Sequence, residues 1–260
     1  MLVRPAAVSG LFYPSDPVEL TAQLDQLMGG GGAKLNYAPT ALIVPHAGYI
    51  YSGEIAGQAY ELLKQRDLYQ QILLIGPPHR IAVQGMVVPS VTYFATPLGH
   101  YPLESALLSE LVSEGWVSFD DSAHELEHSL EVQIPFLQRL GFSAPLIPVI
   151  VGARDPRRVA SLIDHVVSIR PTLILISSDL SHFHDAKTAE QLDAQTTQKI
   201  VTRDYSIKPE EACGSPGING LLYWLQSRGK SIELIAQCNS GDIPAGDRGR
   251  VVGYGAYVVY

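Results

Sequence analysis

Short apolar runs alternate with longer amphipathic segments along most of the chain. The apolar runs are rich in Val, Ile and Leu and have the length of buried strands, whereas apolar residues spaced three and four positions apart indicate helices. The pattern predicts strands at residues 41–45, 72–79, 83–93, 146–151, 172–177, 232–237 and 250–259. It predicts helices at about residues 17–28, 52–65, 102–114, 155–168, 186–203 and 218–225, and a further helix that begins near residue 127.

Strands that alternate with helices predict a single α/β domain over residues 1–260. Helical connections favour a mostly parallel mixed sheet covered on both faces, a three-layer α/β/α arrangement, in which the closing strand pair can be antiparallel. The run from Gly29 to Gly32 predicts a linker, because no strand precedes it and no Gly-Lys-Ser/Thr follows it. Pro148 lacks a backbone N–H and predicts an edge position or a bulge for its strand.

The composition narrows the classes of protein. Of the 260 residues 46% are hydrophobic, which allows a large core. The formal net charge of −8 and a pI near 5.4 argue against a nucleic-acid partner. The N-terminal segment lacks the pattern of a secretory signal, and no apolar run reaches membrane-spanning length, so we expect a cytoplasmic protein without membrane contact. Cys213 and Cys238 are too few for a disulfide framework, and we expect both to be reduced.

Histidines follow two of the predicted strands at the points where the strands end. His46 comes after residues 41–45, and His79 comes after residues 72–75 and a Gly-Pro-Pro turn. Because ligands bind beyond the carboxyl ends of parallel strands, both imidazoles are candidates for a metal site. Two imidazoles and one carboxylate leave open positions on a metal, as in non-haem Fe(II) oxygenases. For each histidine alone, a helix cap or a bond to a carbonyl is the alternative.

The carboxylate of this ligand set has several candidates. They are Asp179, Glu127, Glu131 and Asp242. Asp179 and Asp242 are the better two, because each closely follows an apolar strand. Surface positions on a helix are the simpler interpretation of the two glutamates.

The polar segment around residues 179–184 is the densest candidate for acid-base chemistry. His182 could act as a general acid or base, since its unperturbed pKa lies near neutrality, and Asp179 could orient it; an Asp-capped helix start is the alternative. His128 is expected at the pocket wall or as a hydrogen-bond partner of a ligating histidine. His124 is expected at the surface. Cys213 is interpreted as a small buried apolar residue rather than a thiol nucleophile.

A series of short motifs extends over nearly the whole chain. The motifs are Ser-Gly-Leu-Phe-Tyr at 9–13, Val-Pro-His-Ala-Gly-Tyr at 44–49, Gly-Pro-Pro-His at 76–79, Glu-His-Ser-Leu-Glu at 127–131, Pro-Val-Ile-Val-Gly at 148–152, Ser-Ser-Asp-Leu-Ser-His at 177–182 and Cys-Gly at 213–214. In content and order this series resembles the Memo family, including the protein B type of the AmmeMemoRadiSam system. The resemblance implies a single-domain α/β/α fold similar to that of the class III extradiol dioxygenases, which use mononuclear non-haem Fe(II).

The resemblance also implies a ligand set. By motif, His46 and His79 resemble two metal ligands. The third ligand position falls in the segment before the last strand, where animal relatives have a cysteine; Asp242 lies at or close to that position, and Cys238 is the alternative. An aspartate there would favour Fe(II) over copper, because carboxylates are harder ligands than thiolates.

The pocket side chains follow from the same resemblance. His182 resembles the acid-base histidine of the dioxygenases, and Asp179 and His128 are expected to face the pocket. The site residues expected in total are therefore the ligands His46, His79 and Asp242 and these three pocket residues.

Three functions are compatible with this site. The first is a redox enzyme in which Fe(II) is the metal and His182 moves a proton during oxygen chemistry on a small molecule; copper or zinc are the alternative ions. The second is a non-catalytic protein that binds a peptide or a nucleotide-like ligand, in an assembly with the radical-SAM and AMMECR-type proteins that are often encoded beside microbial members. The third is a zinc hydrolase, with His182 or Asp179 as the base for a metal-bound water.

Overall fold

Four apolar strands pair in parallel at the centre of the molecule. The computed structural model describes residues 2–30, 38–63, 65–152, 155–244 and 246–260. The central strands lie in the order β2 (Ala41–Val44), β9 (Thr172–Ser177), β3 (Gln71–Gly76) and β8 (Leu146–Val151). Nearly all of their residues are buried, as expected for strands covered on both faces. The carboxyl ends of β2, β9 and β3 therefore meet at one rim of the sheet.

Further strands extend this sheet on both sides. On the β2 side lie β12 (Val251–Val259), which is antiparallel to β2, and β11 (Ile232–Asn239) and β10 (His182–His184), which both pair with β12. On the β8 side lie β4 (Met86–Val88) and β7 (Ser118–Phe119). A small separate sheet is formed by β1 (Val3–Arg4), β5 (Tyr93–Thr96) and β6 (Gly99–Pro102). The predicted mixed sheet with an antiparallel closing pair is confirmed.

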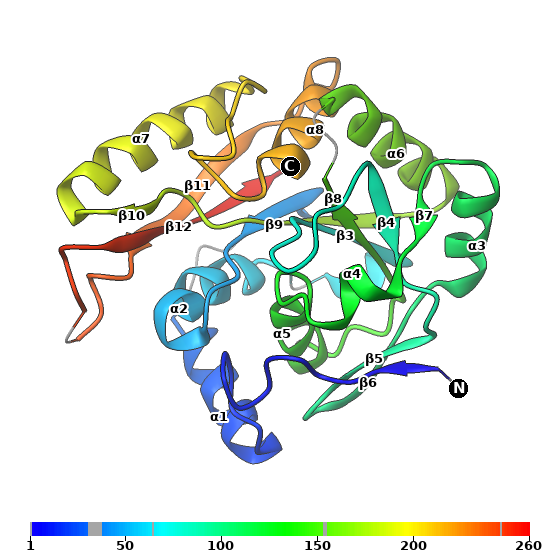
Figure 1. Cartoon of the computed structure of the whole chain (residues 1–260), viewed down its shortest axis with the longest axis horizontal. Helices are drawn as coiled ribbons and strands as arrows, with labels where there is room; N and C mark the ends of the chain where they lie inside the picture. Colours follow the sequence, from blue (N-terminus) through cyan, green and yellow to red (C-terminus); the bar gives the residue numbers. More distant parts are fainter. Residues whose placement is uncertain (1, 31–37, 64, 153–154, 245) are drawn as a thin grey trace.

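Helices cover both faces of the large sheet (Figure 1). One face carries α6 (Pro156–Ile169), α7 (Ala186–Thr202) and α8 (Ser215–Leu225). The other carries α1 (Pro17–Leu27), α2 (Tyr49–Tyr60) and α5 (Ile134–Arg139), while α3 (Ser105–Ser113) and α4 (Asp121–Glu125) lie near the β4 and β7 end. The predicted α/β fold class is confirmed. No helix within the described residues has the length and apolarity needed to span a membrane.

Aspartate caps explain why several helix starts were predictable. Asp16 accepts hydrogen bonds from the backbone N–H groups of Val18 and Glu19, and Pro17 occupies the first turn of α1. Asp155 and Asp185 cap α6 and α7 in the same way. A side-chain oxygen at this position satisfies an N–H that has no partner inside the helix, so Asp before an amphipathic segment indicates the start.

Four predicted helices differ from the structure. Helix α3 begins at Ser105 rather than at residue 102, and α8 begins at Ser215 rather than at residue 218. Helix α2 begins at Tyr49 rather than near Ser52, with Gly48 as its N-cap. The helix expected near Glu127 is interrupted: α4 ends at Glu125, a single 3-10 turn spans Glu131–Gln133, and α5 follows at residue 134. The irregular segment between α4 and the 3-10 turn holds Glu127 and His128. Since side chains on such a segment need not follow helical spacing, they are free to point toward the sheet rim.

Two smaller expectations concern proline and glycine. Pro148 was expected at an edge or a bulge, but β8 lies between β3 and β4. The strand tolerates the proline because β4 pairs only with Ile150 and Val151. No residue of β4 lies opposite Pro148, so no hydrogen bond to β4 is lost through the absence of its N–H. The linker expected at Gly29 to Gly32 extends into residues 31–37, which lie outside the described part of the chain.

His124 is buried, contrary to the expected surface position. Its side chain is 2% exposed, its Nε2 lies 3.2 Å from the carbonyl oxygen of Val87, and its ring contacts that of Phe94. Burial and the nearby positive charge of Arg4 together lower the pKa of His124 to about 4, against the raising effect of the Val87 carbonyl. His124 is therefore neutral in the folded protein at neutral pH.

We expect His124 to make folding sensitive to acid. The pKa is near 6.5 in the unfolded chain and about 4 in the folded one, so its stabilising contribution is complete above pH 6.5 and is lost as the pH falls toward 4. The loss amounts to about 3 kcal/mol in the free energy of unfolding. Urea unfolding of wild type and His124→Gln at pH 7 and pH 4.5 measures it, and the variant should show the smaller decrease. His100→Gln, at an exposed position, is the control and should behave as wild type.

Candidate metal centre

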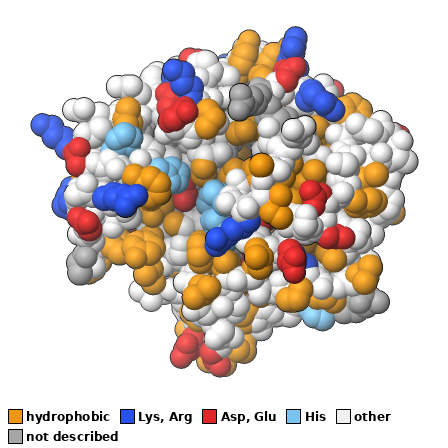
Figure 2. Space-filling model, in the orientation of Figure 1, with side chains coloured by type: hydrophobic (Ala, Val, Ile, Leu, Met, Phe, Trp, Pro, Cys, Tyr) orange, Lys and Arg blue, Asp and Glu red, His pale blue; other side chains and the backbone are white. Residues whose placement is uncertain are grey.

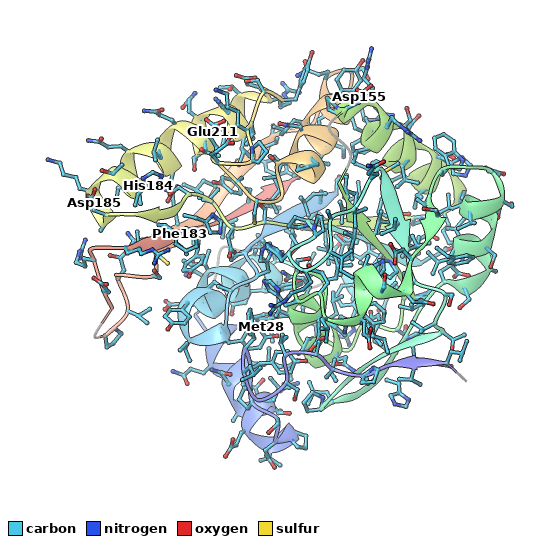
Figure 3. The ribbon with its side chains drawn as sticks, viewed as in Figure 1. Met28, Asp155, Phe183, His184, Asp185 and Glu211 are labelled. Atoms are coloured by element: carbon cyan, nitrogen blue, oxygen red, sulfur yellow. The ribbon has the colours of Figure 1, made fainter. Side chains whose placement is uncertain are left out.

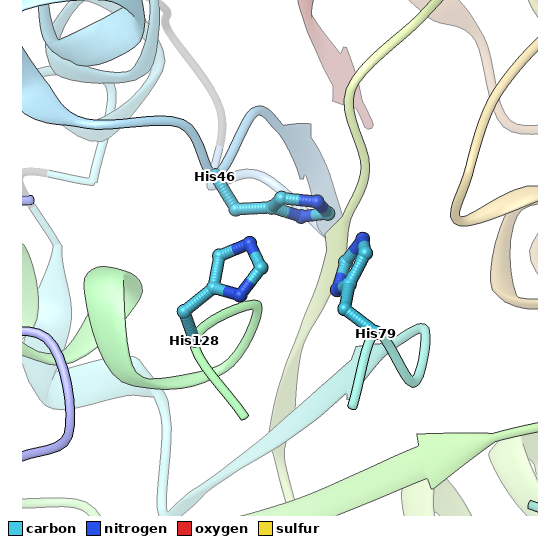
Figure 4. Close-up of side chains that lie close together, drawn as sticks. All are labelled: His46, His79 and His128. Carbon is cyan, nitrogen blue, oxygen red and sulfur yellow. The ribbon is translucent and has the colours of Figure 1, made fainter. Parts of the chain in front are cut away.

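Three imidazole rings converge at the sheet rim (Figure 4). His46 follows β2, His79 follows β3, and His128 lies on the irregular segment before the 3-10 turn. Their ring centroids are 5.0 Å apart for His46 and His79, 5.4 Å for His46 and His128, and 4.5 Å for His79 and His128. One ring nitrogen from each lies within 4.8 Å of the others, close enough for all three to share one metal ion. The predicted meeting of His46 and His79 thus occurs in the structure.

The hydrogen bonds of His46 leave its Nε2 atom available. The Ser177 hydroxyl at the end of β9 donates its single proton to the carbonyl oxygen of Ser129, at 2.5 Å. It must therefore accept from His46 Nδ1, 2.9 Å away, which assigns the ring proton to Nδ1. Nε2 then carries the lone pair, which faces the Cys213 thiol 3.3 Å away and is the atom that could bind a metal ion.

Glu127 orients His79 in a similar way. Its Oε1 accepts from His79 Nδ1 at 2.9 Å and from the Ser129 N–H at 2.9 Å, and its Oε2 accepts from the His79 N–H at 2.5 Å. Burial alone would raise the pKa of Glu127, but these hydrogen bonds and the His79 charge lower it to about 2. The side chain is therefore an ionised carboxylate behind an imidazole, the common support of metal-bound histidines.

The ring of His128 has a buried nitrogen without a hydrogen bond. Its Nδ1 has no hydrogen-bond partner among the described residues and lies 3.4 Å from Glu127 Oε1. The ring packs against Phe12, with centroids 4.8 Å apart. A buried polar atom without a hydrogen-bond partner costs free energy. An imidazole at this position is therefore unfavourable if the site holds nothing but protein atoms. A bound cation shared with the two other imidazoles would account for a histidine here.

A metal ion binds neutral imidazoles, and the surroundings of His46 and His128 favour that form. Burial lowers the pKa of His46 well below its ordinary value, and the charges of His79, His128 and His182 lower it further. Burial and the His79 charge lower the pKa of His128 to about 4. Since protons and metal ions compete for the same lone pairs, depressed histidine pKa values favour metal binding at neutral pH.

Asp179 lies beside the cluster as a potential proton carrier. Burial raises the pKa of Asp179 to about 7, although the hydrogen bond from the His46 N–H, at 2.8 Å, lowers it. Its Oδ2 is 3.9 Å from His46 Nε2. His182, on β10, is half-buried, and burial followed by the charge of His79 lowers its pKa. A carboxyl with a pKa near neutrality can both give and accept a proton.

Cys213 is a residue of this site that the sequence interpretation missed. It precedes α8, and its Sγ lies 3.3 Å from His46 Nε2 and 3.3 Å from the N–H of Asp179. Burial and then the Asp179 charge raise the pKa of its thiol. The Cys-Gly pair after a long helix was the available signal, and the close approach of Gly214 to Ser178 explains the glycine: a Cβ there would lie 2.5 Å from Ser178 Cβ.

Asp242 and Cys238 are not among the described side chains whose ligand atoms lie within 4.8 Å of one another. Asp242 is in the turn between β11 and β12, where its Oδ2 accepts from the Asn239 N–H and its Oδ1 lies 3.6 Å from Arg248. Cys238 is on β11, half-buried and paired with Tyr254 of β12. The group of described side chains that could hold a metal contains His128 rather than Asp242.

Both glutamates of the Glu-His-Ser-Leu-Glu motif are buried, contrary to the expected helix surface. Glu127 is 2% exposed and Glu131 is fully buried. Glu131 pairs with Arg4 at 2.6 Å, and its carboxylate also accepts from the N–H groups of Ala7 and Val8 and from the Tyr13 hydroxyl. The N-terminal segment is thereby anchored to the segment that carries His128.

A cleft opens in front of the cluster. Its volume is about 610 Å³, and it is lined by His128 and Asp179 together with residues of the N-terminal segment, α2 and the β11–β12 turn. Figure 2 shows histidine side chains at the surface of this face with hydrophobic and basic side chains around them. The cleft is large enough for a small organic molecule.

An α/β protein in which three imidazoles converge at the carboxyl rim of the sheet has a site that could hold one metal ion. Comparison with known proteins identifies the family. The sequence model of the Memo-like protein family matches residues 4–258, and the chain belongs to that family.

Relatives agree with this assignment, and a solved structure shares the fold. The chain is 32% identical to a MEMO1 family protein of Thermoplasma volcanium, over 99% of this chain and 98% of the relative, and 33% identical to one of Thermoplasma acidophilum, over 98% of each. A MEMO1 family protein of Thermotoga neapolitana is 32% identical over 97% of this chain and 98% of its own length. An uncharacterised protein of Escherichia coli K12 has a similar fold, with a TM-score of 0.54 at 15% identity, over 85% of this chain and 100% of that one.

Proposed function

We propose that this protein is a metal-dependent oxidoreductase that acts on a small molecule in the cleft. The observation that carries the proposal is the convergence of His46, His79 and His128. Ser177 and Glu127 assign the ring protons of His46 and His79 to Nδ1. In this proposal the three imidazoles hold the ion. They replace the set of two histidines and Asp242 that the sequence suggested.

The donor set supports a first-row transition metal. Imidazole nitrogens suit iron, copper, nickel and zinc, and a thiol sulfur such as that of Cys213 beside His46 is compatible with iron, copper and zinc. We propose Fe(II) as the working ion. A bound Fe(II) ion would supply open coordination positions at which a substrate and dioxygen meet. Of the residues that would hold it, His128 lines the cleft, together with Asp179.

The protein's own residues would control the proton. Asp179, with its pKa raised to about 7, can take a proton from a hydroxyl group of a substrate in the cleft and return it to the product. The hydrogen bond from the His46 N–H holds this carboxyl in place. His182, whose charge is felt at His46, is the second candidate for this transfer.

Anaerobic purification followed by elemental analysis tests the proposal. We expect about one iron atom per chain, together with oxygen consumption when a panel of small hydroxylated aromatic compounds is supplied in an oxygen electrode. Absence of any stoichiometric first-row metal contradicts the proposal. Full metal loading without oxygen uptake across the panel favours a non-catalytic binding protein, for which radical-SAM and AMMECR-type proteins are the proposed partners.

Three imidazoles without a carboxylate ligand also favour a second candidate, a zinc hydrolase. Three histidines are the donor set of the catalytic zinc in carbonic anhydrase, and Asp179 would then be the base for a metal-bound water. Zinc as the purified ion, with turnover of esters or amides in oxygen-free buffer, would support this function and exclude the first.

A further inference from the structure

Arg250 is a basic side chain in the wall of the cleft. It stands at the start of β12 and is the single lysine or arginine among the described residues that line the cleft. Within the described part of the chain it forms no ion pair. Arg248, two residues away, differs in both respects: it pairs with Glu190 at 3.5 Å and with Asp242 at 3.6 Å, and it does not line the cleft. Arg250 therefore has a charge available for a ligand.

The guanidinium of Arg250 is held over an aromatic ring. Its Cζ atom lies 4.4 Å from the ring centroid of Phe183, whose side chain is 63% exposed. Figure 3 shows Phe183 next to His184 on β10. Phe183 has a φ of 67°, a conformation that costs energy for a bulky side chain. The pairing of β10 with β12 also shifts register between His182 and His184. This irregular backbone places the phenyl ring of Phe183 in solvent. There the ring makes a cation–π contact that holds the guanidinium of Arg250.

The rest of the lining limits the kind of ligand. The cleft wall is largely aromatic and apolar, with Phe12, Tyr51 and Tyr254 among its residues. Two carboxylates also line it, Asp179 and Asp247, and the latter accepts a hydrogen bond from the Gly249 N–H. The single guanidinium of Arg250 can pair with a ligand that carries one negative charge. A phosphate dianion would have a second negative charge without a partner, close to the carboxyl groups of Asp179 and Asp247.

We propose that Arg250 is the residue that selects the substrate, by binding the carboxylate of a small aromatic acid. The aromatic body would lie against the apolar wall, and the end away from the carboxylate would face His128 and Asp179. A guanidinium already placed over a ring loses little freedom when it forms a two-point contact with a carboxylate. This inference rests on the proposed function, since it names the substrate class of the same site.

A matched pair of probes tests the proposal. 2-Naphthoate and 2-naphthamide have the same shape and differ in charge, and both fluoresce, so binding to the protein as purified can be titrated directly. We expect wild type to bind the acid about tenfold more tightly than the amide, since a charge-assisted pair of hydrogen bonds supports a difference of that size. Arg250→Gln should lose this preference, with amide binding within about twofold of wild type.

Arg248→Gln is the control, because that arginine lies in the same turn but outside the cleft. It should retain the full preference for the acid. Repeating the titration after chelation separates this inference from the proposed function: an Arg250-dependent preference that persists without metal supports the role of Arg250 whatever the ion does. The inference is overturned if wild type binds both probes equally or binds neither, or if Arg250→Gln keeps the preference.

Discussion

Replacement of Glu131 by alanine should lower the free energy of unfolding by about 3–5 kcal/mol, the range found when one partner of a buried ion pair is removed. Arg4 is 4% exposed and Glu131 is fully buried, so the substitution leaves a guanidinium charge inside the protein without its carboxylate. It also removes the acceptor for the N–H groups of Ala7 and Val8 and for the Tyr13 hydroxyl. Urea unfolding followed by circular dichroism measures the change.

Two further variants show whether the cost comes from the unpaired charge. Glu125→Ala removes an exposed glutamate from the end of α4 and should change stability by less than about 1 kcal/mol, as expected for a surface charge. The double variant Arg4→Met/Glu131→Leu removes both charges and should recover part of the lost stability, because no charge then remains buried alone. A Glu131→Ala protein as stable as wild type would show that the pair contributes nothing.

The same ion pair affects the shape of the candidate site. Besides Glu131, Arg4 donates to the carbonyl oxygen of His124 at 2.6 Å and to that of Glu127 at 2.7 Å. The segment between α4 and the 3-10 turn has no regular secondary structure, so these side-chain contacts replace the hydrogen bonds that a helix would provide. The position of His128, and with it the shape of the candidate metal site, therefore depends on Arg4 near the N-terminus.

Two of the three histidines of the cluster could be predicted from the sequence because local signals placed them. His46 and His79 each follow a short apolar run, and parallel pairing of β2, β9 and β3 then brings strand ends to one rim. The prediction did not require the order of the strands in the sheet, because the carboxyl ends of parallel strands lie at the same edge in any order. For the same reason Asp179, which follows β9, was correctly expected near the histidines.

The other residues of the site are placed by contacts between distant parts of the chain, which a local sequence pattern does not predict. His128 follows no strand, and its segment has helix-like polarity, so its approach to His46 comes only from the tertiary fold. Glu131 has the sequence environment of a surface residue, and its partner Arg4 is 127 residues away. Cys213 precedes a helix, and a thiol at such a position is more often simple packing. Long-range packing decided each of these cases.

Replacement of His46 by alanine should reduce the affinity for a first-row metal by more than about 100-fold, since loss of even an outer hydrogen-bond partner of a metal-bound histidine costs 10–100-fold. His46 is 1% exposed and presents its Nε2 to the space it shares with His79 and His128. Glu127→Gln should have a smaller effect, of about 10–100-fold, because His79 would keep its nitrogen but lose the ionised carboxylate behind it. Competition titrations of Fe(II) and Zn²⁺ against a chromophoric chelator under anaerobic conditions give the affinities.

Two variants decide which third side chain belongs to the centre. His128→Ala should weaken binding as strongly as His46→Ala, whereas Asp242→Asn, in the β11–β12 turn, should bind metal as wild type does. His100→Ala at an exposed position controls for nonspecific binding to histidine, and a thermal melt of each metal-free variant separates loss of a ligand from loss of the fold. Loss of metal in Asp242→Asn together with its retention in His128→Ala would overturn the three-histidine centre. The aspartate ligand set that the sequence suggested would then be correct, which would require the β11–β12 turn to move toward the rim when the ion binds.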